Sequence, residues 1–197
     1  MSKNPNVAKA ITSINNSSER QLAILGGGCF WCVETIYNDL QGVNTAISGY
    51  SGGAAETADY ETVCSKTTDH VEVVLVDFDP REVSYEEVLK IFFSVHNPTT
   101  PNRQGNDVGP QYRSAIFYTD DSQKETAEHI MQDFAPTLWD DPIVTELIPF
   151  EAFYPAEDYH QDYFNRVGDR NPYCSMVIAP KVGKFRKSFA HRLKSNQ

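Results

Sequence analysis

The chain has 197 residues, of which 40% are hydrophobic and 12% aromatic, enough to build the core of one domain. Its net charge of −10 argues against nucleic acid as a partner. Four cysteines are too few for a disulfide scaffold, and no apolar run is long enough to cross a membrane. The first 20 residues also lack the apolar middle of a signal peptide. These features predict a cytoplasmic protein with reduced thiols and no membrane contact.

The charge is distributed unevenly along the chain. Residues 181–197 contain six Lys or Arg side chains and no Asp or Glu, so the remaining 180 residues carry −16. This basic end is open to two interpretations, a contact with an acidic partner or an ordinary solvated surface.

Predicted strands and helices alternate along the chain. Residues 1–20 are polar and predicted to be a loose extension, and 21–197 are predicted to form a single domain. Strands are expected at 22–25, 43–49, 70–78, 112–118 and 143–148. Helices are expected from Cys29 to residue 40 and at 84–95, 120–134 and 156–166, with loops at 54–69 and 96–111 and an irregular end. This order predicts an α/β (α+β) sandwich, a mixed sheet with helices packed on it.

The most informative stretch runs from Gly26 to Glu34. Three glycines follow an apolar strand and precede a helix, so Cys29 is predicted in the first helical turn. The free N–H groups and positive dipole end found there favour a thiolate, so we expect the pKa of Cys29 to lie below its usual value of about 8.5. Phe30 and Trp31 follow directly. An isolated cysteine could equally be a small buried hydrophobe, but this combination of features favours a nucleophile.

Cys29 and Cys32 form a C-x-x-C pair that is compatible with a thiol–disulfide oxidoreductase. A zinc site is not expected, because there is no second C-x-x-C and the five histidines do not cluster at metal-ligand spacing. The pair by itself therefore indicates redox chemistry without metal.

Glu72 lies within an apolar strand, flanked by Val71 and Val73. If both faces of that strand are covered, burial raises the pKa of the carboxyl and makes it a proton donor. By simple alternation the same position could face solvent, and the strand alone leaves both possibilities open. Tyr60, Asp107 and Tyr112 lie on or beside the two long loops, where each is individually more often structural than catalytic.

Several motifs together resemble the peptide methionine sulfoxide reductase A family. They span roughly residues 22–187, and the main ones are Gly28-Cys29-Phe30-Trp31, His70-Val71-Glu72-Val73, Arg103-Gln104-Gly105-Asn106-Asp107 and Asn171-Pro172-Tyr173-Cys174. The resemblance implies an enzyme with a ferredoxin-like core that reduces the S epimer of methionine sulfoxide, free or in proteins. It implies no metal and no bound organic cofactor, with thioredoxin as the reductant, or dithiothreitol in vitro. We expect the protein to act as a monomer.

The resemblance also implies a role for each matching residue. Cys29 matches the nucleophile, and Glu72 matches the acid that protonates the sulfoxide oxygen. Phe30 and Trp31 match the wall that holds the substrate methyl group. Tyr60 and Tyr112 match residues that assist this acid by hydrogen bonding, and Asp107 matches a supporting polar residue. Cys174 matches the resolving cysteine.

The second thiol of the cycle has two candidates, Cys174 and Cys32. Many family members have glycine where this chain has Cys32, and no cysteine follows Cys174. Cys174 lies in a segment predicted to be irregular and able to bend, whereas Cys32 has apolar neighbours and is expected to pack. We therefore expect Cys174 to resolve the sulfenic acid, with Cys32 as the alternative.

Overall fold

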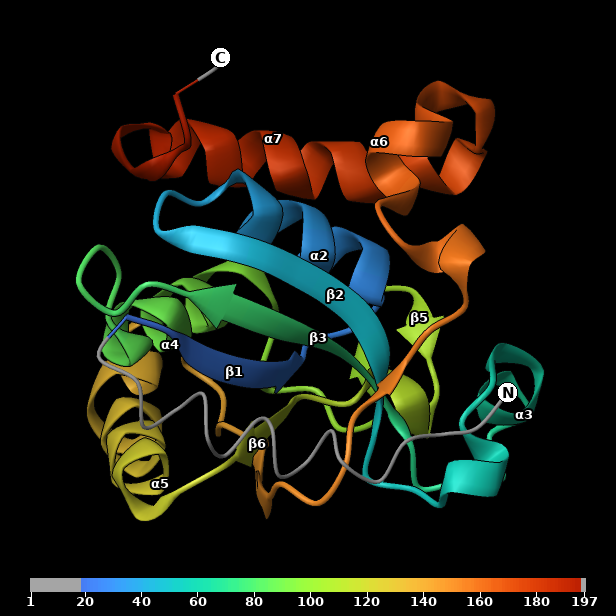
Figure 1. Ribbon diagram of the computed structural model, residues 1–197, viewed down its shortest axis with the longest axis horizontal. Helices are drawn as coiled ribbons and strands as arrows, with labels where there is room; N and C mark the ends of the chain where they lie inside the picture. Colours follow the sequence, from blue (N-terminus) through green and yellow to red (C-terminus); the bar gives the residue numbers. More distant parts are fainter. Residues whose placement is uncertain (1–18, 196–197) are drawn as a thin grey trace.

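The computed structural model describes residues 19–195. The expected N-terminal extension falls almost entirely outside these residues. Within them the chain forms a six-stranded sheet in the order β7-β6-β1-β3-β2-β8 (Figure 1). All neighbouring strands are antiparallel except β6 and β7, which are parallel. The strands are β1 (Gln21–Gly26), β2 (Val43–Ser51), β3 (Val71–Phe78), β6 (Ala115–Tyr118), β7 (Glu146–Pro149) and β8 (Tyr154–Pro155).

The centre of the sheet has the connectivity of a ferredoxin-like fold. Its elements follow the order β1-α2-β2-β3-α4-β6, with α2 at Phe30–Asp39 and α4 at Tyr85–Val95. Strands β6, β1, β3 and β2 lie side by side in that order. The predicted mixed sheet with helices packed on it is thereby confirmed.

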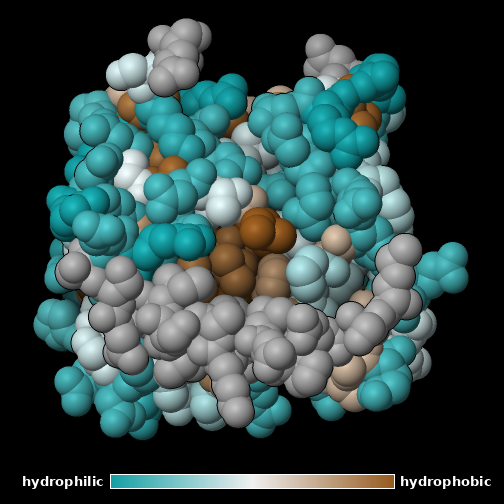
Figure 2. Space-filling model, in the orientation of Figure 1, coloured by the Kyte–Doolittle hydropathy of each residue, from teal (hydrophilic) through white to brown (hydrophobic). Residues whose placement is uncertain are grey.

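Strand β3 lies in the middle of the sheet and is buried at all eight positions. Val74, Val76 and Phe78 belong to the apolar core shared with the helices, whereas Val71 and Val73 belong to a second apolar cluster on the opposite face. Figure 2 shows an apolar patch on that opposite face, in the region of β2 and β3. Because side chains alternate along a strand, Glu72 projects to the helix-covered face.

The two predicted loops contain short elements of their own. Residues 54–69 include η1 (Ala55–Thr57) and α3 (Tyr60–Cys64). Residues 96–111 include a small hairpin of β4 (Arg103–Gln104) and β5 (Asp107–Val108), followed by η2 (Pro110–Tyr112). These elements carry Tyr60, Asp107 and Tyr112 to the same end of the sheet.

The predicted helix at 156–166 is only partly present. It consists of η5 (Asp158–His160) and α6 (Tyr163–Val167), which are separated at Asp162, where φ is +50°. By contrast, the predicted helix at 120–134 is confirmed as α5 (Asp121–His129) continuing into a π-helical turn, η3 (Ile130–Phe134).

The C-terminal end is helical, so the expectation of an irregular segment was wrong. A π-helical turn, η7 (Cys174–Ile178), leads into α7 (Ala179–Ser188), which lies across the top of Figure 1 above α2. Ile178, Val182 and Phe185 are buried in the main core. Pro180 directly follows the π-helical turn, so it lies inside a continuous helical run, where a proline disfavours helix locally.

Candidate active site

The glycine turn between β1 and α2 sets the position of Cys29. Gly28 has φ +88°, and a Cβ at that position would lie 2.5 Å from Cγ of Gln104. Only glycine fits, because both the backbone conformation and the close approach of Gln104 exclude a side chain. Cys29 follows as the N-cap residue of α2 and is partly exposed.

Cys29 opens into a cavity of about 180 Å³. The cavity is formed by residues from β3, α2, α3 and the segments around Asp107 and Tyr173, and it brings together most of the residues singled out from the sequence. Its lining residues are Cys29, Phe30, Trp31, Tyr60, Glu72, Asp107, Tyr112 and Tyr173.

Glu72 is buried, with 2% of its surface exposed, so the solvent-facing alternative is excluded. Its Oε2 accepts a hydrogen bond of 3.1 Å from the backbone N–H of Phe30, the first residue of α2. Burial raises the pKa of Glu72 to about 8; the charge of Asp107 adds to this effect and the Phe30 N–H opposes it. At neutral pH the carboxyl therefore holds a proton that it can donate into the cavity.

The thiol of Cys29 is tuned differently from our expectation. Burial and the neighbouring Glu72 charge raise its pKa well above the usual value, whereas the Trp31 N–H and the Tyr173 hydroxyl lower it. The predicted depression of the pKa is thus wrong for the substrate-free site. The physical reason is that burial of the thiol, together with the neighbouring Glu72, outweighs the hydrogen bond from the Trp31 N–H.

The aromatic wall is held firmly. Trp31 stacks on Tyr163 with ring centroids 3.8 Å apart and planes inclined by 9°. Its indole Nε1–H donates to Nδ1 of His160 at 3.0 Å, and the His160 ring also lies 5.1 Å from that of Phe30 and 4.5 Å from that of Tyr60. A single buried histidine therefore supports three of the lining side chains.

Three tyrosines border the cavity as hydrogen-bond donors. Burial raises the pKa values of Tyr60, Tyr112 and Tyr173, so their hydroxyls stay protonated. The Tyr173 hydroxyl donates to Oδ2 of Asp107 at 2.6 Å. Sequence reasoning missed Tyr173, although its place directly before Cys174 was an available signal.

Neither candidate for the second thiol lines the cavity. Cys174 is fully buried at the start of η7, and Cys32 is 6% exposed. Burial raises the pKa of Cys32 to about 11, in keeping with its expected packing role. All four cysteines are free thiols.

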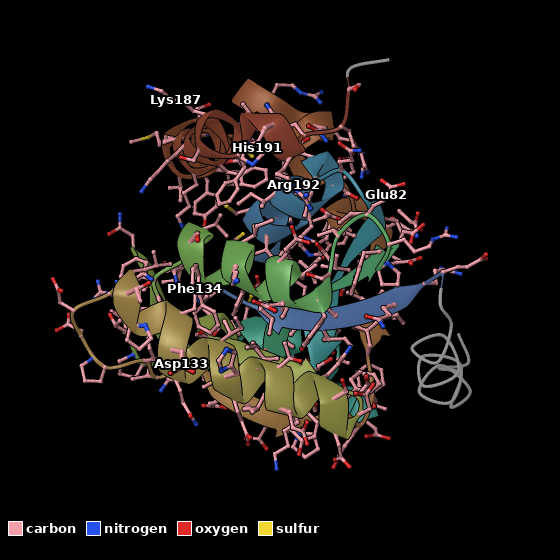
Figure 3. The ribbon with its side chains drawn as sticks, turned by 90° about the vertical axis from the view of Figure 1, so that its left-hand side faces the viewer. Glu82, Asp133, Phe134, Lys187, His191 and Arg192 are labelled. Carbon is pink, nitrogen blue, oxygen red and sulfur yellow. The ribbon has the colours of Figure 1, made fainter. Side chains whose placement is uncertain are left out.

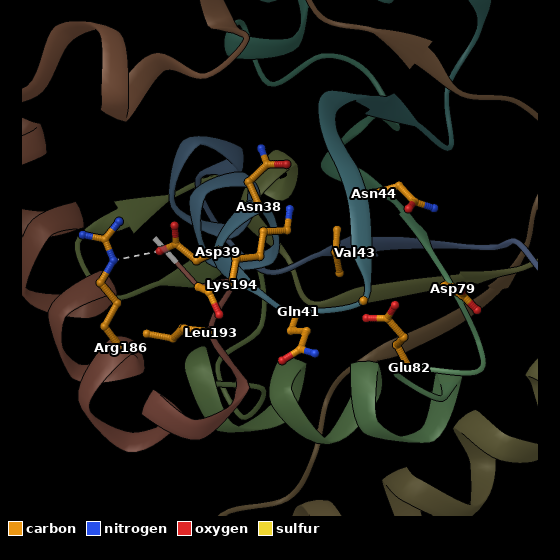
Figure 4. Close-up of a pocket in the computed structure, with 12 residues that line it drawn as sticks. Asn38, Asp39, Gln41, Val43, Asn44, Asp79, Glu82, Arg186, Leu193 and Lys194 are labelled. Atoms are coloured by element: carbon orange, nitrogen blue, oxygen red, sulfur yellow. Dashed lines mark hydrogen bonds and ion pairs between the residues drawn. The ribbon is translucent and has the colours of Figure 1, made fainter. Parts of the chain in front are cut away.

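A larger hollow, of about 1040 Å³, lies at the other end of α2 (Figure 4). It is bordered by Asn38, Asp39 and Lys194, with an ion pair of 2.8 Å between Arg186 and Asp39. None of the described residues that border it carries a thiol, so it offers no counterpart to the Cys29–Glu72 pair. Within residues 19–195, no group of three His, Cys, Asp or Glu side chains could hold a metal ion, and no helix is long and apolar enough to span a membrane.

Comparison with known proteins identifies clear relatives. The family model described as peptide methionine sulfoxide reductase matches residues 21–193. The peptide methionine sulfoxide reductase MsrA of Sulfolobus acidocaldarius is 52% identical over 169 residues, which are 86% of this chain and 95% of that protein.

Solved structures show the same relationship. Mxr1 from Saccharomyces cerevisiae in its reduced form superposes with a TM-score of 0.71 at 32% identity, covering 81% of this chain and 91% of that one. The same yeast protein in complex with Trx2 gives a TM-score of 0.51 at 25% identity, covering 75% of this chain and 87% of that one.

Proposed function

The chain belongs to the peptide methionine sulfoxide reductase family and reduces methionine sulfoxide with recycling by thioredoxin, and on this premise we propose that Cys29 is the nucleophile that attacks the sulfoxide sulfur. The observation that carries the proposal is that Cys29 and the buried Glu72 share one small cavity. A nucleophile and an acid with different environments in one site are what this reaction requires.

The first half of the cycle needs one proton in the right place. The Cys29 thiolate attacks the sulfur and forms an S–S bond while Glu72 protonates the sulfoxide oxygen; the S–O and S–S bonds then break as the hydroxyl group passes to the Cys29 sulfur. The products are methionine and a sulfenic acid on Cys29. Glu72 ends the step as a carboxylate, and the proton that it donated becomes the hydroxyl proton of the sulfenic acid, so the proton count balances.

The cavity supports selectivity for one epimer. The substrate methyl group fits against Phe30 and Trp31, while Glu72, Tyr60 and Tyr112 surround the position of the oxygen. Apolar aromatic surface suits a thioether methyl group, and fixing both substituents fixes the handedness at sulfur. We propose that this selects the S epimer.

The second half of the cycle requires a second thiol. We propose Cys174: its thiol condenses with the sulfenic acid to give a Cys29–Cys174 disulfide and water. Thioredoxin then reduces that disulfide, as the known complex of the yeast relative with Trx2 supports. The four free thiols fit a reducing compartment such as the cytoplasm.

The test of the proposed function is turnover of a mixture of both epimers of a peptide methionine sulfoxide with dithiothreitol. Chiral chromatography should show loss of the S epimer only, and Cys29→Ser should show no loss at all. Equal consumption of both epimers would contradict the fixed pocket, and activity in Cys29→Ser would contradict the nucleophile.

A further inference from the structure

Helix α7 carries a stripe of three lysines, Lys181, Lys184 and Lys187, spaced three residues apart. Lys184 and Lys187 are exposed and Lys181 is half-buried. None of the three forms an ion pair with a described carboxylate, whereas the neighbouring cations Arg186 and Arg192 are paired with Asp39 and Glu87. Figure 3 shows Lys187 at the outer surface of α7. The lysine stripe is thus a local positive surface on an otherwise acidic protein.

An apolar hollow of about 220 Å³ lies beside the lysine stripe, and Lys181 and Lys184 are among the residues that border it. Its walls include Val95, Trp139 and Phe189. Trp139 is anchored through its Nε1–H, which donates to the carbonyl of Phe93 at 2.9 Å. A rigid apolar hollow beside free cations is the arrangement in which a protein partner places an apolar anchor surrounded by carboxylates.

The lysine stripe also lies within reach of the redox centre, because α7 continues directly from the turn that holds Cys174. At a rise of about 1.5 Å per residue, Lys181, Lys184 and Lys187 lie about 10, 15 and 20 Å along the helix from Cys174. A stable protein contact covers about 800 Å² on each partner, a disc of roughly 16 Å radius. A protein that reacts with a disulfide at Cys174 therefore covers most of the stripe.

We propose that the lysine stripe and its adjacent hollow form the docking surface for the protein reductant, which contacts them through carboxylates beside its reactive dithiol. The inference rests on the proposed recycling by thioredoxin. One reductant thiolate attacks the Cys29–Cys174 disulfide to give a mixed disulfide, and the second reductant thiol displaces it. Two electrons pass to the chain, which regains two thiols, while the reductant becomes a disulfide. Dithiothreitol performs the same exchange without docking.

The remainder of the chain carries −16 and repels an acidic protein, so the stripe has a clear electrostatic role. Within a Debye length of about 8–10 Å, its free ammonium groups attract the partner and orient it toward the disulfide. This attraction should raise the rate at which the two proteins associate, and added salt should reduce the effect.

The test compares Lys184→Glu with Lys124→Glu, an identical charge reversal on α5, where the native lysine is half-buried and lies 3.8 Å from a carboxylate oxygen of Glu128. Lys184 is preferred to Lys181 because the charge of Lys181 reaches Cys32 and His96. Each variant is driven by an acidic thioredoxin or by dithiothreitol, at about 20 mM and 300 mM salt. We expect Lys184→Glu to lower kcat/KM for thioredoxin about tenfold at low salt, mainly through KM, and less at high salt.

Turnover with dithiothreitol should stay within about twofold for both variants, as should thioredoxin-driven turnover of Lys124→Glu. An equal effect of the two reversals would overturn the docking surface, as would a salt-independent loss in Lys184→Glu. Failure of the unaltered chain with thioredoxin while dithiothreitol sustains turnover would also overturn it. Failure of the unaltered chain with dithiothreitol would instead contradict the proposed function.

Discussion

At the scale of single residues, Cys29 and Glu72 behave as a coupled pair. Each carries a raised pKa, and the charge on Glu72 raises that of Cys29. Such a pair loses its protons in two macroscopic steps, the first at about pH 8. The reaction requires a Cys29 thiolate beside a protonated Glu72, a state in which the pair holds one proton. This state exists between the two deprotonation steps.

The pH dependence of the reaction follows from this count. Below pH 8 the pair holds both protons, so kcat/KM for the sulfoxide should rise with pH up to about 8. It should fall again at higher pH, when the second proton leaves. Stopped-flow measurement of methionine formation from pH 6 to 10 checks this, and a rate that falls steadily from pH 6 would show that the pair is not coupled as described.

Replacing the acid tests its role directly. Glu72→Gln keeps the size of the side chain but cannot donate a carboxyl proton, so formation of the sulfenic acid should slow by at least about 10²-fold. Single-turnover trapping of the sulfenic acid provides the measurement. If the rate were unchanged, the proton would have to come from one of the three tyrosines.

Among single residues, the sequence indicates the functional ones best where they lie beside a clear local sequence pattern. The glycine turn pointed to Cys29, whereas the strand alone left the orientation of Glu72 open and its role was implied only by the family resemblance. The pKa of Cys29 could not be predicted, because it is raised by burial of the thiol in the folded chain and by Glu72, a residue 43 positions away in the sequence.

At the scale of elements, the segment around η5 supports the aromatic wall. His160 accepts the Trp31 indole N–H, and Gln161 fixes the segment to β2 by accepting from the Ser48 N–H at 3.1 Å and donating to the Ser48 carbonyl at 2.9 Å. Asp162, which follows, donates its backbone N–H to the buried Glu34 of α2 at 3.0 Å. This segment therefore joins α2 to the edge of the sheet.

Loss of the His160 acceptor should loosen Trp31. His160→Leu leaves the indole N–H without its partner, at a cost of about 1–3 kcal/mol, and should raise KM about tenfold. His160→Asn offers an acceptor again and should recover much of the affinity. Steady-state kinetics and the fluorescence of Trp31 report the change, and identical behaviour of the two variants would show that the hydrogen bond has no positioning role.

Cys32 in α2 and Cys174 at the start of η7 should contribute differently to turnover. Cys174→Ser should still release one methionine per enzyme but lose turnover with thioredoxin, whereas Cys32→Ser should keep both. Peptide mapping after substrate should find a Cys29–Cys174 disulfide. A predominant Cys29–Cys32 disulfide with full turnover in Cys174→Ser would make the C-x-x-C pair the working couple.

The elements themselves were predictable wherever local patterns and packing agree, as in β3 and α4. Helix α7 was not, since Pro180 and Gly183 disfavour helix locally and only the burial of Val182 and Phe185 against the core compensates. Similarly, nothing local indicates that Asp162 adopts a left-handed conformation to break the helix predicted at 156–166.

At the scale of the whole molecule, buried titratable groups make stability depend on pH in a defined window. Burial lowers the pKa of His96 to about 4, so the contribution of His96 to stability rises with pH between about 4 and 6.5, where the unfolded histidine loses its proton. Burial raises the pKa values of Glu34 to about 7 and Glu72 to about 8, so the folded state keeps protons that the unfolded chain has already lost. Their stabilising contribution is present in full below about pH 4.5, where the unfolded carboxyls ionise, and is lost as pH rises from there through about 7 for Glu34 and about 8 for Glu72.

Two falling carboxyl contributions outweigh one rising histidine contribution, so these three groups should make the free energy of unfolding fall with pH from about 4.5 to about 8. Each carboxyl contributes up to about 1.4 kcal/mol per pH unit within its window. Urea titrations at pH 6.5, 7.25 and 8 measure the decline, and Glu72→Gln should remove most of it above pH 7. Constant stability across this range in the unaltered chain would mean that neither carboxyl is protonated in the folded state.

The burial of Cys174 within a helical turn has a consequence for temperature. The sulfenic acid forms in a cavity that is already assembled, so its rate should rise gently on warming. Cys174 is fully buried and does not line the cavity, so disulfide formation requires packed structure around it to open, which carries a large activation enthalpy. On cooling, the enzyme should continue to repair one methionine quickly yet wait progressively longer before the next.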